Sequence, residues 1–415
     1  MQRILLCLTV INSFLLQSVI AEEYWNQFRG PNGNGKTIAI GLPTKFSEGS
    51  KNIQWKTAIH GKGWSSPVVW GNQIWMTTAT ADGTKMYAVC VNAKSGNIIH
   101  DVLIFENVDP AYCHPTNSYA SPTPVIEEGR IYVHFGTFGT ACLDTKTAKV
   151  LWERRDLKCD HHRGPGSSPV VFQNLLIVNY DGVDVQYVVA FDKRTGETVW
   201  RKTRDIDYGT DNGDRKKAYG TPALFKIDGK HQLVNPTAVA TIAYAPLTGE
   251  EIWRVRHGGM NAAAKPLLEN GLIYINAGNG PRDLIAFRPP KSGVVSENEI
   301  AWTNSKSVPR RSSQLVVDDL FFMINDTGVA SCLDAKTGKI HWQKRLEGKF
   351  WASPLYADGN IYFFGDDGRV PVVAAATEFK LLEDNRLNSG FNASPAVVGK
   401  ALILRTKEHL YRLEE

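Results

Sequence analysis

The chain has 415 residues, of which 43% are hydrophobic, and its 47 Lys and Arg against 42 Asp and Glu give a formal charge of +5. This composition excludes a disordered chain and a long-helix protein, and the small, scattered positive charge argues against a nucleic-acid-binding surface. The 36 Gly and 20 Pro separate many short apolar runs. That spacing predicts strands and turns rather than helices.

The first 21 residues have the pattern of a cleaved secretory signal. Arg3 precedes an apolar stretch over residues 4–16, and residues of small or moderate size lead to Ala21. Cleavage near Ala21 predicts a periplasmic or secreted protein. No later run reaches the roughly 18 apolar residues of a membrane span, and Cys7 lies too early to carry a lipid. We therefore expect neither a membrane span nor a lipid anchor.

A short apolar strand, usually led by Pro, recurs eight times along the rest of the chain. The spacings between the marker residues run from 40 to 57 residues, and the markers are Pro67, Pro124, Pro169, Pro222, Pro266, Gln314, Pro354 and Pro395. In seven of the eight units an apolar residue, such as Ile74 or Ile131, follows seven positions after the marker. A repeat of this length with four short strands is typical of a β-propeller blade.

Most units end in a turn and a strand that closes in Trp. TGKIHW ends at Trp342 and TGETVW at Trp200. The Gly permits the positive φ of a tight turn, and the Thr can hydrogen-bond the turn backbone. A Trp at one repeated position is expected to pack between neighbouring blades.

The two ends of the chain predict how the ring closes. After Pro395 there is room for three strands, and the segment NIQWKTAI over residues 52–59, with Trp55 at the position of the closing Trp, supplies the fourth. Closure of this kind removes exposed sheet edges. We predict a signal over residues 1–21, an N-terminal extension over 22–50, and one all-β propeller domain over 51–415 with eight four-stranded antiparallel blades.

These features resemble a known repeat. The Pro-led strand and the ending LDAKTGKIHW over residues 333–342 resemble the PQQ-like (pyrroloquinoline-quinone enzyme-type) propeller repeat of quinoprotein dehydrogenases and BamB-type outer-membrane assembly lipoproteins. The segments over residues 24–35, 63–70 and 184–200 are similar to a group of secreted bacterial propellers with that repeat. The resemblance implies PQQ and calcium as candidate cofactors, although this fold serves enzymes, scaffolds and binding proteins alike.

Two of the six cysteines stand apart. Cys90, Cys142 and Cys332 share a repeat position that other blades fill with Ala, so they are expected to be core residues. Cys113 and Cys159 lie in the loops before the innermost strands of blades two and three, which open on one face. In an exported protein a Cys113–Cys159 disulfide is the first expectation, with free thiols and metal ligation as alternatives.

The residues just before each marker should ring the central opening, because every blade presents this segment to the same face. The candidate site there comprises Trp64, Tyr119, His161, Arg163, Tyr219, Arg311 and Trp351. Aromatic rings beside Arg and His suit a flat anionic ligand, which can stack on the rings and pair with guanidinium groups. The same residues are also compatible with a water-filled funnel.

One acidic loop is a weak candidate for a metal. DIDYGTDNGDRKK over residues 205–217 carries Asp205, Asp207 and Asp211, which could wrap calcium. Their spacing departs from the D-x-D-x-D-G order of a calcium loop, so a solvated turn is the preferred interpretation. The sequence gives no firm metal site.

No motif identifies a reaction, and the catalytic residues remain unknown. The chain has no adjacent Cys pair, no C-x-x-C-H haem site, and no G-x-S-x-G or H-E-x-x-H motif. We expect a monomeric extracytoplasmic module that binds a protein or a small anionic ligand on its funnel face. No nucleic acid is expected as a partner.

Two alternatives remain. A PQQ-dependent oxidoreductase of alcohols or sugars would stack its quinone on Trp64 or Trp351, pair the carboxylates with Arg163 or Arg311, and use His161 for the substrate proton. An outer-membrane protein assembly scaffold of BamB type is disfavoured by the lack of a lipid-anchor Cys.

Overall fold

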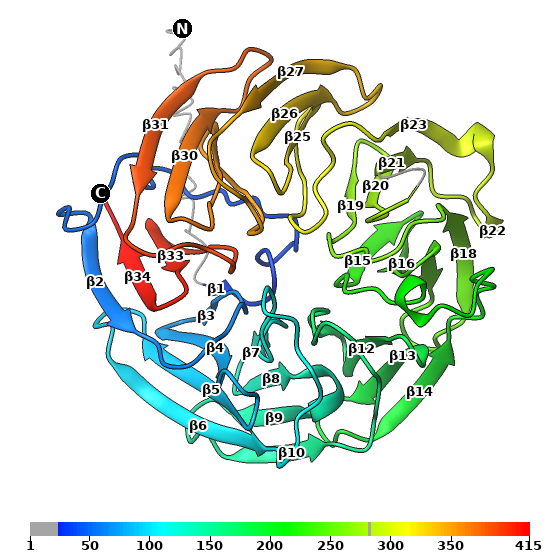
Figure 1. The fold of residues 1–415 in the computed structure, drawn as a ribbon, viewed down its shortest axis with the longest axis horizontal. Helices are drawn as coiled ribbons and strands as arrows, with labels where there is room; N and C mark the ends of the chain where they lie inside the picture. The colour runs from blue at the N-terminus through cyan, green and yellow to red at the C-terminus, as the bar shows by residue number, and fades with distance from the viewer. Residues whose placement is uncertain (1–23, 281–283) are drawn as a thin grey trace, which may run out of the picture.

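The structure is a computed structural model that describes residues 24–280 and 284–415, so the predicted signal lies outside the described residues. Eight sheets stand in a ring around a central axis (Figure 1). Within the described residues the only helices are three short 3-10 turns, η1 (Gly136–Phe138), η2 (Gly213–Arg215) and η3 (Glu297–Glu299). The predicted all-β, eight-bladed propeller is therefore confirmed.

The first four blades contain most of the longer strands. Blade one consists of β1 (Tyr24–Trp25), β3 (Val68–Trp70), β4 (Gln73–Ala79), β5 (Lys85–Asn92) and β6 (Ile98–Glu106), and blade two of β7 (Val125–Glu127), β8 (Arg130–His134), β9 (Thr140–Asp144) and β10 (Val150–Arg154). Blade three consists of β11 (Val170–Phe172), β12 (Leu175–Asp181), β13 (Gln186–Asp192) and β14 (Thr198–Thr203). Blade four consists of β15 (Ala223–Ile227), β16 (Lys230–Pro236), β17 (Ala240–Tyr244), β18 (Glu251–Arg256) and β22 (Gly293–Val294).

The remaining blades have four strands each. Blade five consists of β19 (Leu267–Glu269), β20 (Leu272–Asn276), β21 (Leu284–Phe287) and β23 (Ile300–Asn304), and blade six of β24 (Leu315–Val317), β25 (Leu320–Ile324), β26 (Val329–Asp334) and β27 (Ile340–Arg345). Blade seven consists of β28 (Leu355–Ala357), β29 (Asn360–Tyr362), β30 (Arg369–Ala374) and β31 (Leu381–Arg386). Blade eight consists of β32 (Ala396–Val398), β33 (Ala401–Arg405), β34 (His409–Leu413) and β2 (Ile53–Ala58).

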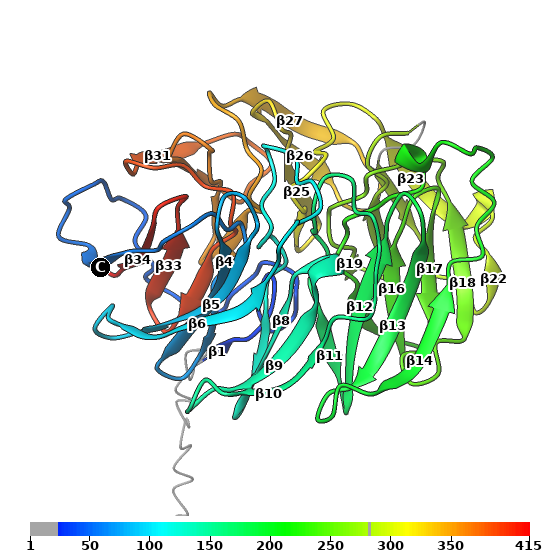
Figure 2. The same ribbon diagram turned by 60° about the horizontal axis from the view of Figure 1, so that its bottom comes forward.

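The eight markers each stand directly before an innermost strand. Val68 follows Pro67, and Leu315 follows Gln314, the one marker that is not Pro. Pro fits this place because a residue before the first ladder position need not donate a backbone hydrogen bond. All eight innermost strands thus enter the ring from one face, which we call the funnel face; the side view in Figure 2 shows the strands running between this face and the opposite one.

The ring closes as predicted. β2 pairs antiparallel with β34, with Trp55 opposite Arg412, so the strand near the N-terminus completes the last blade. The N-terminal extension is not separate from the propeller: β1 pairs with β3 at the inner edge of blade one. A second unpredicted addition is β22, which runs parallel to β18 outside blade four.

The closing Trp of one blade packs on the turn of the next. The Trp302 indole lies under Gly338, where an added Cβ would be 2.7 Å from the ring, and Trp302 Nε1 donates to the Ala335 carbonyl at 2.8 Å. Trp55, Trp152 and Trp200 meet Gly96, Gly196 and Gly249 in the same way. The repeated Trp is therefore a contact between blades, as its position predicts.

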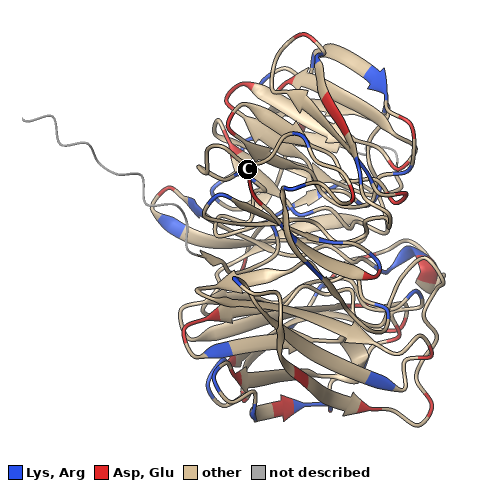
Figure 3. Ribbon diagram, turned by 90° about the vertical axis from the view of Figure 1, so that its left-hand side faces the viewer, with Lys and Arg blue, Asp and Glu red and all other residues tan. Residues whose placement is uncertain are grey.

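Charge is spread over the molecule. On the side shown in Figure 3, Lys and Arg alternate with Asp and Glu along the strands and loops. Among the described residues, no helix has the length and apolar character needed to cross a membrane.

Candidate functional site

A ring of hydroxyl side chains surrounds the axis just above the innermost strands. The side chain of the residue before a marker accepts a hydrogen bond from the backbone N–H of its counterpart in the preceding blade. Ser66 N–H donates to Thr123 Oγ1 at 2.9 Å, and Thr123 N–H donates to Ser168 Oγ at 2.9 Å. The same bond joins Ser168 to Thr221, Lys265 to Ser313, Ser313 to Ser353, Ser353 to Ser394, and Ser394 to Ser66. These bonds satisfy buried amides that no sheet partner reaches.

The ring is interrupted once. Lys265 takes the place of the hydroxyl residue in blade five, so the Thr221 amide has no side-chain hydroxyl to donate to there. We had not predicted this ring, although its signal, a Ser or Thr directly before seven of the eight markers, is visible in the repeats.

A cavity of about 220 Å³ opens above this ring on the funnel face. Trp64, Arg163, Tyr219, Arg311 and Trp351, five of the seven predicted site residues, line it. Six ring hydroxyls line it as well, from Ser66, Thr123, Ser168, Thr221, Ser353 and Ser394. The structure thus brings these five predicted residues together at one opening.

Aromatic and cationic side chains of this cavity contact one another. The Arg311 guanidinium carbon lies 4.3 Å from the centre of the Trp351 ring, and Arg311 Nη1 donates to Asp326 Oδ2 at 2.7 Å. In the loop before blade one, two places further round the ring, Trp64 Nε1 donates to the Thr116 carbonyl at 3.3 Å. Both indoles are half-buried, so a part of each remains open to a ligand.

Two predicted site residues point elsewhere. Tyr119 packs edge-on against Phe138 at 5.5 Å and covers the turn at Gly83. His161 is buried, stacks on Tyr180 at 6.4 Å, and accepts the Thr137 amide on Nε2 at 3.1 Å. Burial lowers the pKa of His161 to about 4, so the imidazole is neutral at physiological pH.

The predicted disulfide is not formed. Cys159 is 3% exposed in the core between blades two and three, where its Sγ lies 3.8 Å from His161 Nδ1. Cys113 is half-buried, with its Sγ 3.6 Å from the Arg163 carbonyl and against Gly164. Both thiols are free because Cys159 turns into the apolar core while Cys113 stays in the loop. Cys90, Cys142 and Cys332 are buried, as their repeat position predicts.

The acidic loop does not gather its carboxylates. Asp205 accepts the Thr203 hydroxyl at 2.8 Å, and Asp207 accepts the Gly209 amide at 2.9 Å. Asp214 pairs instead with the buried Lys217. Over residues 24–280 and 284–415, no three His, Cys, Asp or Glu side chains are placed to share a metal ion.

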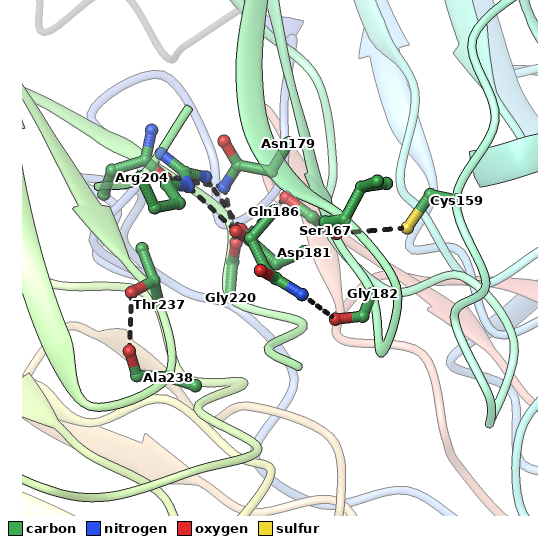
Figure 4. A network of polar contacts seen from close by, with 12 residues as sticks. Cys159, Ser167, Asn179, Asp181, Gly182, Gln186, Arg204, Gly220, Thr237 and Ala238 are labelled. Atoms are coloured by element: carbon green, nitrogen blue, oxygen red, sulfur yellow. Dashed lines mark hydrogen bonds and ion pairs between the residues drawn. The ribbon is translucent and has the colours of Figure 1, made fainter. Parts of the chain in front are cut away.

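A buried ion pair supports the funnel-face loops of blades three and four (Figure 4). Arg204 donates from Nε and Nη2 to the two oxygens of Asp181, at 2.8 and 2.7 Å. Asn179 donates to Asn235 Oδ1 at 2.6 Å, and to the Gly220 carbonyl at 3.2 Å, and so joins the two blades. With both carboxylate oxygens occupied, Asp181 serves as a structural residue rather than as a base.

The floor of the cavity comes from the N-terminus. Residues 25–35, which we call the plug, fold into the centre of the ring, where their dark blue trace is visible in Figure 1. Phe28 of the plug lines the cavity from below. The neighbouring Arg29 is 1% exposed and donates to the backbone carbonyls of Asn34, at 2.7 Å, and Gln314.

Comparison with known proteins finds similar propellers. The family described as outer membrane protein assembly factor BamB matches residues 293–414. Two relatives carry that name: one from Legionella pneumophila (strain Paris) is 20% identical over 241 residues, 58% of this chain and 48% of its own, and one from Moranella endobia (strain PCIT) is 23% identical over 307 residues, 73% and 70%. The chain thus spans about half the length of the Legionella relative.

Solved structures repeat the likeness at the level of the fold. BamB from Moraxella catarrhalis superposes with a TM-score of 0.61 at 11% identity, over 87% of this chain and 99% of that one. The quinohemoprotein alcohol dehydrogenase from Comamonas testosteroni superposes with a TM-score of 0.63 at 13% identity, over 94% and 80%. The chain folds as an eight-bladed β-propeller that is similar to both of these proteins.

The side chains that line the funnel cavity suit ligand binding better than acid–base chemistry. Its lining residues include two Trp, two Arg, amides and hydroxyls, but no Asp, Glu, His or Cys. Guanidinium groups beside indoles can hold a planar anion such as a quinone tricarboxylate. A calcium ion prefers carboxylate oxygens, and a substrate proton needs a base; the lining supplies neither, so it fits the quinone only in part.

Proposed function

We propose that the protein is an extracytoplasmic binding module whose funnel face takes a planar, negatively charged group, carried by a small ligand or by a partner protein. The observation that carries the proposal is that Trp64, Trp351, Arg163 and Arg311 line one cavity with no carboxylate among its lining residues. Arg311 lies over Trp351, and its partner Asp326 stands outside the lining. Indoles supply flat surface for stacking, and guanidinium groups supply charge and two parallel donors.

The probe for this proposal is PQQ itself, a planar tricarboxylate. Calorimetric titration of the purified protein should give a saturable heat in the absence of calcium. A dye-reduction assay with PQQ, calcium and alcohols or sugars should remain silent. Absence of a heat with and without calcium would refute the proposed anion site, and dye reduction would support an oxidoreductase instead.

A scaffold role in outer-membrane protein assembly is the second candidate. The BamB family match over residues 293–414 and the two relatives with that name favour it, and they favour a protein as the partner. Deletion of the gene in its host would then lower the amount of β-barrel proteins in the outer membrane. Unchanged levels of these proteins would remove this candidate.

A further inference from the structure

A second cavity lies at the other end of the axis. It measures about 550 Å³ and is bounded by the plug and by the inner strands β11, β15 and β19 of blades three, four and five. Lys226 and His231, which flank the hairpin turn between β15 and β16, mark its rim. Because this turn is the end of blade four away from Pro222, the cavity opens on the face opposite the funnel.

Lys265 reaches this cavity from the break in the hydroxyl ring. The residue is 4% exposed and lines the cavity, and Nζ makes no hydrogen bond to any described residue. The plug approaches it through Gly33, where an added Cβ would lie 2.2 Å from Nζ and φ is +62°. The positive φ favours Gly at this position, and the absence of a side chain leaves room for the lysine tip next to the plug backbone.

Arg29 adds a second buried cation beside Lys265. Its Nε and Nη1 have no hydrogen-bond partner, and its only acceptors are backbone carbonyls. Burial, together with the charge of Arg29, lowers the pKa of Lys265 to about 7. The Arg29 guanidinium and the Lys265 side chain thus lie near one another, and no Asp or Glu lines the cavity between the plug and the inner strands.

Among the residues that the structure describes, no carboxylate lies in the lining of this cavity. The residues that line the cavity include Lys226, His231 and Lys265 but no Asp or Glu. Glu269, the acid of β19, is paired with Lys36 at 2.9 Å. Burial of an unpaired charge lowers the stability of the fold. An anion that binds beside it is attracted strongly, because the buried site has a low dielectric constant.

We propose that this cavity is a second ligand site, which takes a small organic anion whose carboxylate or phosphate group pairs with the Lys265 ammonium. The hydrophobic wall formed by Leu224 and Leu268 would contact the apolar part of the ligand. His231, tilted against Phe172 at 5.1 Å, and Lys226 stand at the opening, where the Lys226 ammonium attracts the anion. This site is separate from the funnel and does not depend on the function proposed for it.

The test uses two probes, inorganic phosphate and citrate, which distinguish the two anionic groups. Calorimetric titration of the full chain should give a saturable heat with at least one of them. Lys265→Met keeps the length of the side chain and removes its charge, and it should weaken that binding at least tenfold. Lys400→Met, at an exposed lysine in the turn between β32 and β33 outside the cavity, is the matched control and should leave the binding unchanged.

Two further variants keep the proposal falsifiable. Arg311→Ala alters only the funnel and should leave this binding unchanged; loss of binding in that variant would place the anion in the funnel and refute the proposal. Leu224→Trp narrows the cavity from β15 and should weaken binding at least tenfold while the protein retains its cooperative unfolding. Absence of heat with both probes, or full binding by Lys265→Met or Leu224→Trp, would also refute it.

Discussion

Arg311 and Trp351 contact each other across two blades at the funnel. The guanidinium carbon lies 4.3 Å from the centre of the indole, while Asp326 holds the same guanidinium from the other side at 2.7 Å. Arg311 comes from the loop before blade six and Trp351 from the loop before blade seven. The pair therefore presents a flat surface and a positive charge at a fixed mutual position.

Substitution of either residue should weaken binding of the PQQ probe with little change in the stability of the protein. Trp351→Ala removes the stacking surface and Arg311→Ala removes the charge, so each should lower the association constant at least tenfold in a calorimetric titration. An exposed cation–π contact contributes only about 0.5–1 kcal/mol, so the free energy of unfolding should change little. Arg345→Ala, in an exposed arginine outside the cavity, is the control, and wild-type affinity in both funnel variants would contradict the prediction.

Gly338 and Gly359 offer a matched test of the contact between blades. Both have positive φ, +71° and +76°, but a Cβ on Gly338 meets the Trp302 ring at 2.7 Å, whereas one on Gly359 meets nothing within 4 Å. Gly359→Ala should cost about 1 kcal/mol of backbone strain. Gly338→Ala should cost clearly more, because it also displaces the indole and its hydrogen bond. Urea unfolding measures both, and equal losses would show that the Trp contact contributes nothing.

The thiols of Cys113 and Cys159 should be free in the purified protein. Mass spectrometry without reduction should show both cysteines alkylated after unfolding, and a peptide pair joined by a disulfide would contradict the structure. In the native protein, burial raises the pKa of Cys113 to about 11 and that of Cys159 further still. Alkylation at pH 7.5 should therefore be slow at Cys113 and slower at Cys159, since the thiolate is the reactive form.

Three buried histidines should make the fold sensitive to acid. Burial lowers the pKa of His134 to about 3 and those of His161 and His257 to about 4, from 6.5 in the unfolded chain. The unfolded state then binds more protons below pH 6.5, so the free energy of unfolding falls as the pH drops from 6.5 toward 4. Each group with a shift of this size contributes on the order of 2–3 kcal/mol to that fall.

Urea midpoints at pH 7.5, 5.5 and 4.5 measure this effect. His161→Gln should flatten the pH dependence, and His231→Gln, at an exposed position, should leave it unchanged. The ring protons of His161 should titrate near pH 4 in NMR spectra. Titration near pH 6.5 would show that the imidazole is open to solvent at the funnel after all.

Much of the fold could be predicted from the sequence because the sequence repeats. Pro67 and its counterparts mark every innermost strand, and Trp55, far from Pro395 in sequence, completes the last blade. Each blade is built from strands adjacent in sequence, so turn residues and alternating apolar positions suffice to identify it. The funnel position of Trp64, Arg163, Tyr219, Arg311 and Trp351 follows from the same repetition.

Tyr119, His161, Cys159 and the plug were not predictable in this way. The loops before the innermost strands vary from blade to blade. Whether a side chain of such a loop faces the opening or the core depends on the residues that pack against it. Tyr119 packs on Phe138, and His161 packs on Tyr180. Arg29 finds its acceptor on Gln314, 285 residues away along the chain. The sequence repeat thus determined the strands, the blades and the closure of the ring, because each of these follows from a local pattern that recurs along the chain. Only the tertiary structure decided where single side chains point, because that depends on contacts between segments far apart in the sequence.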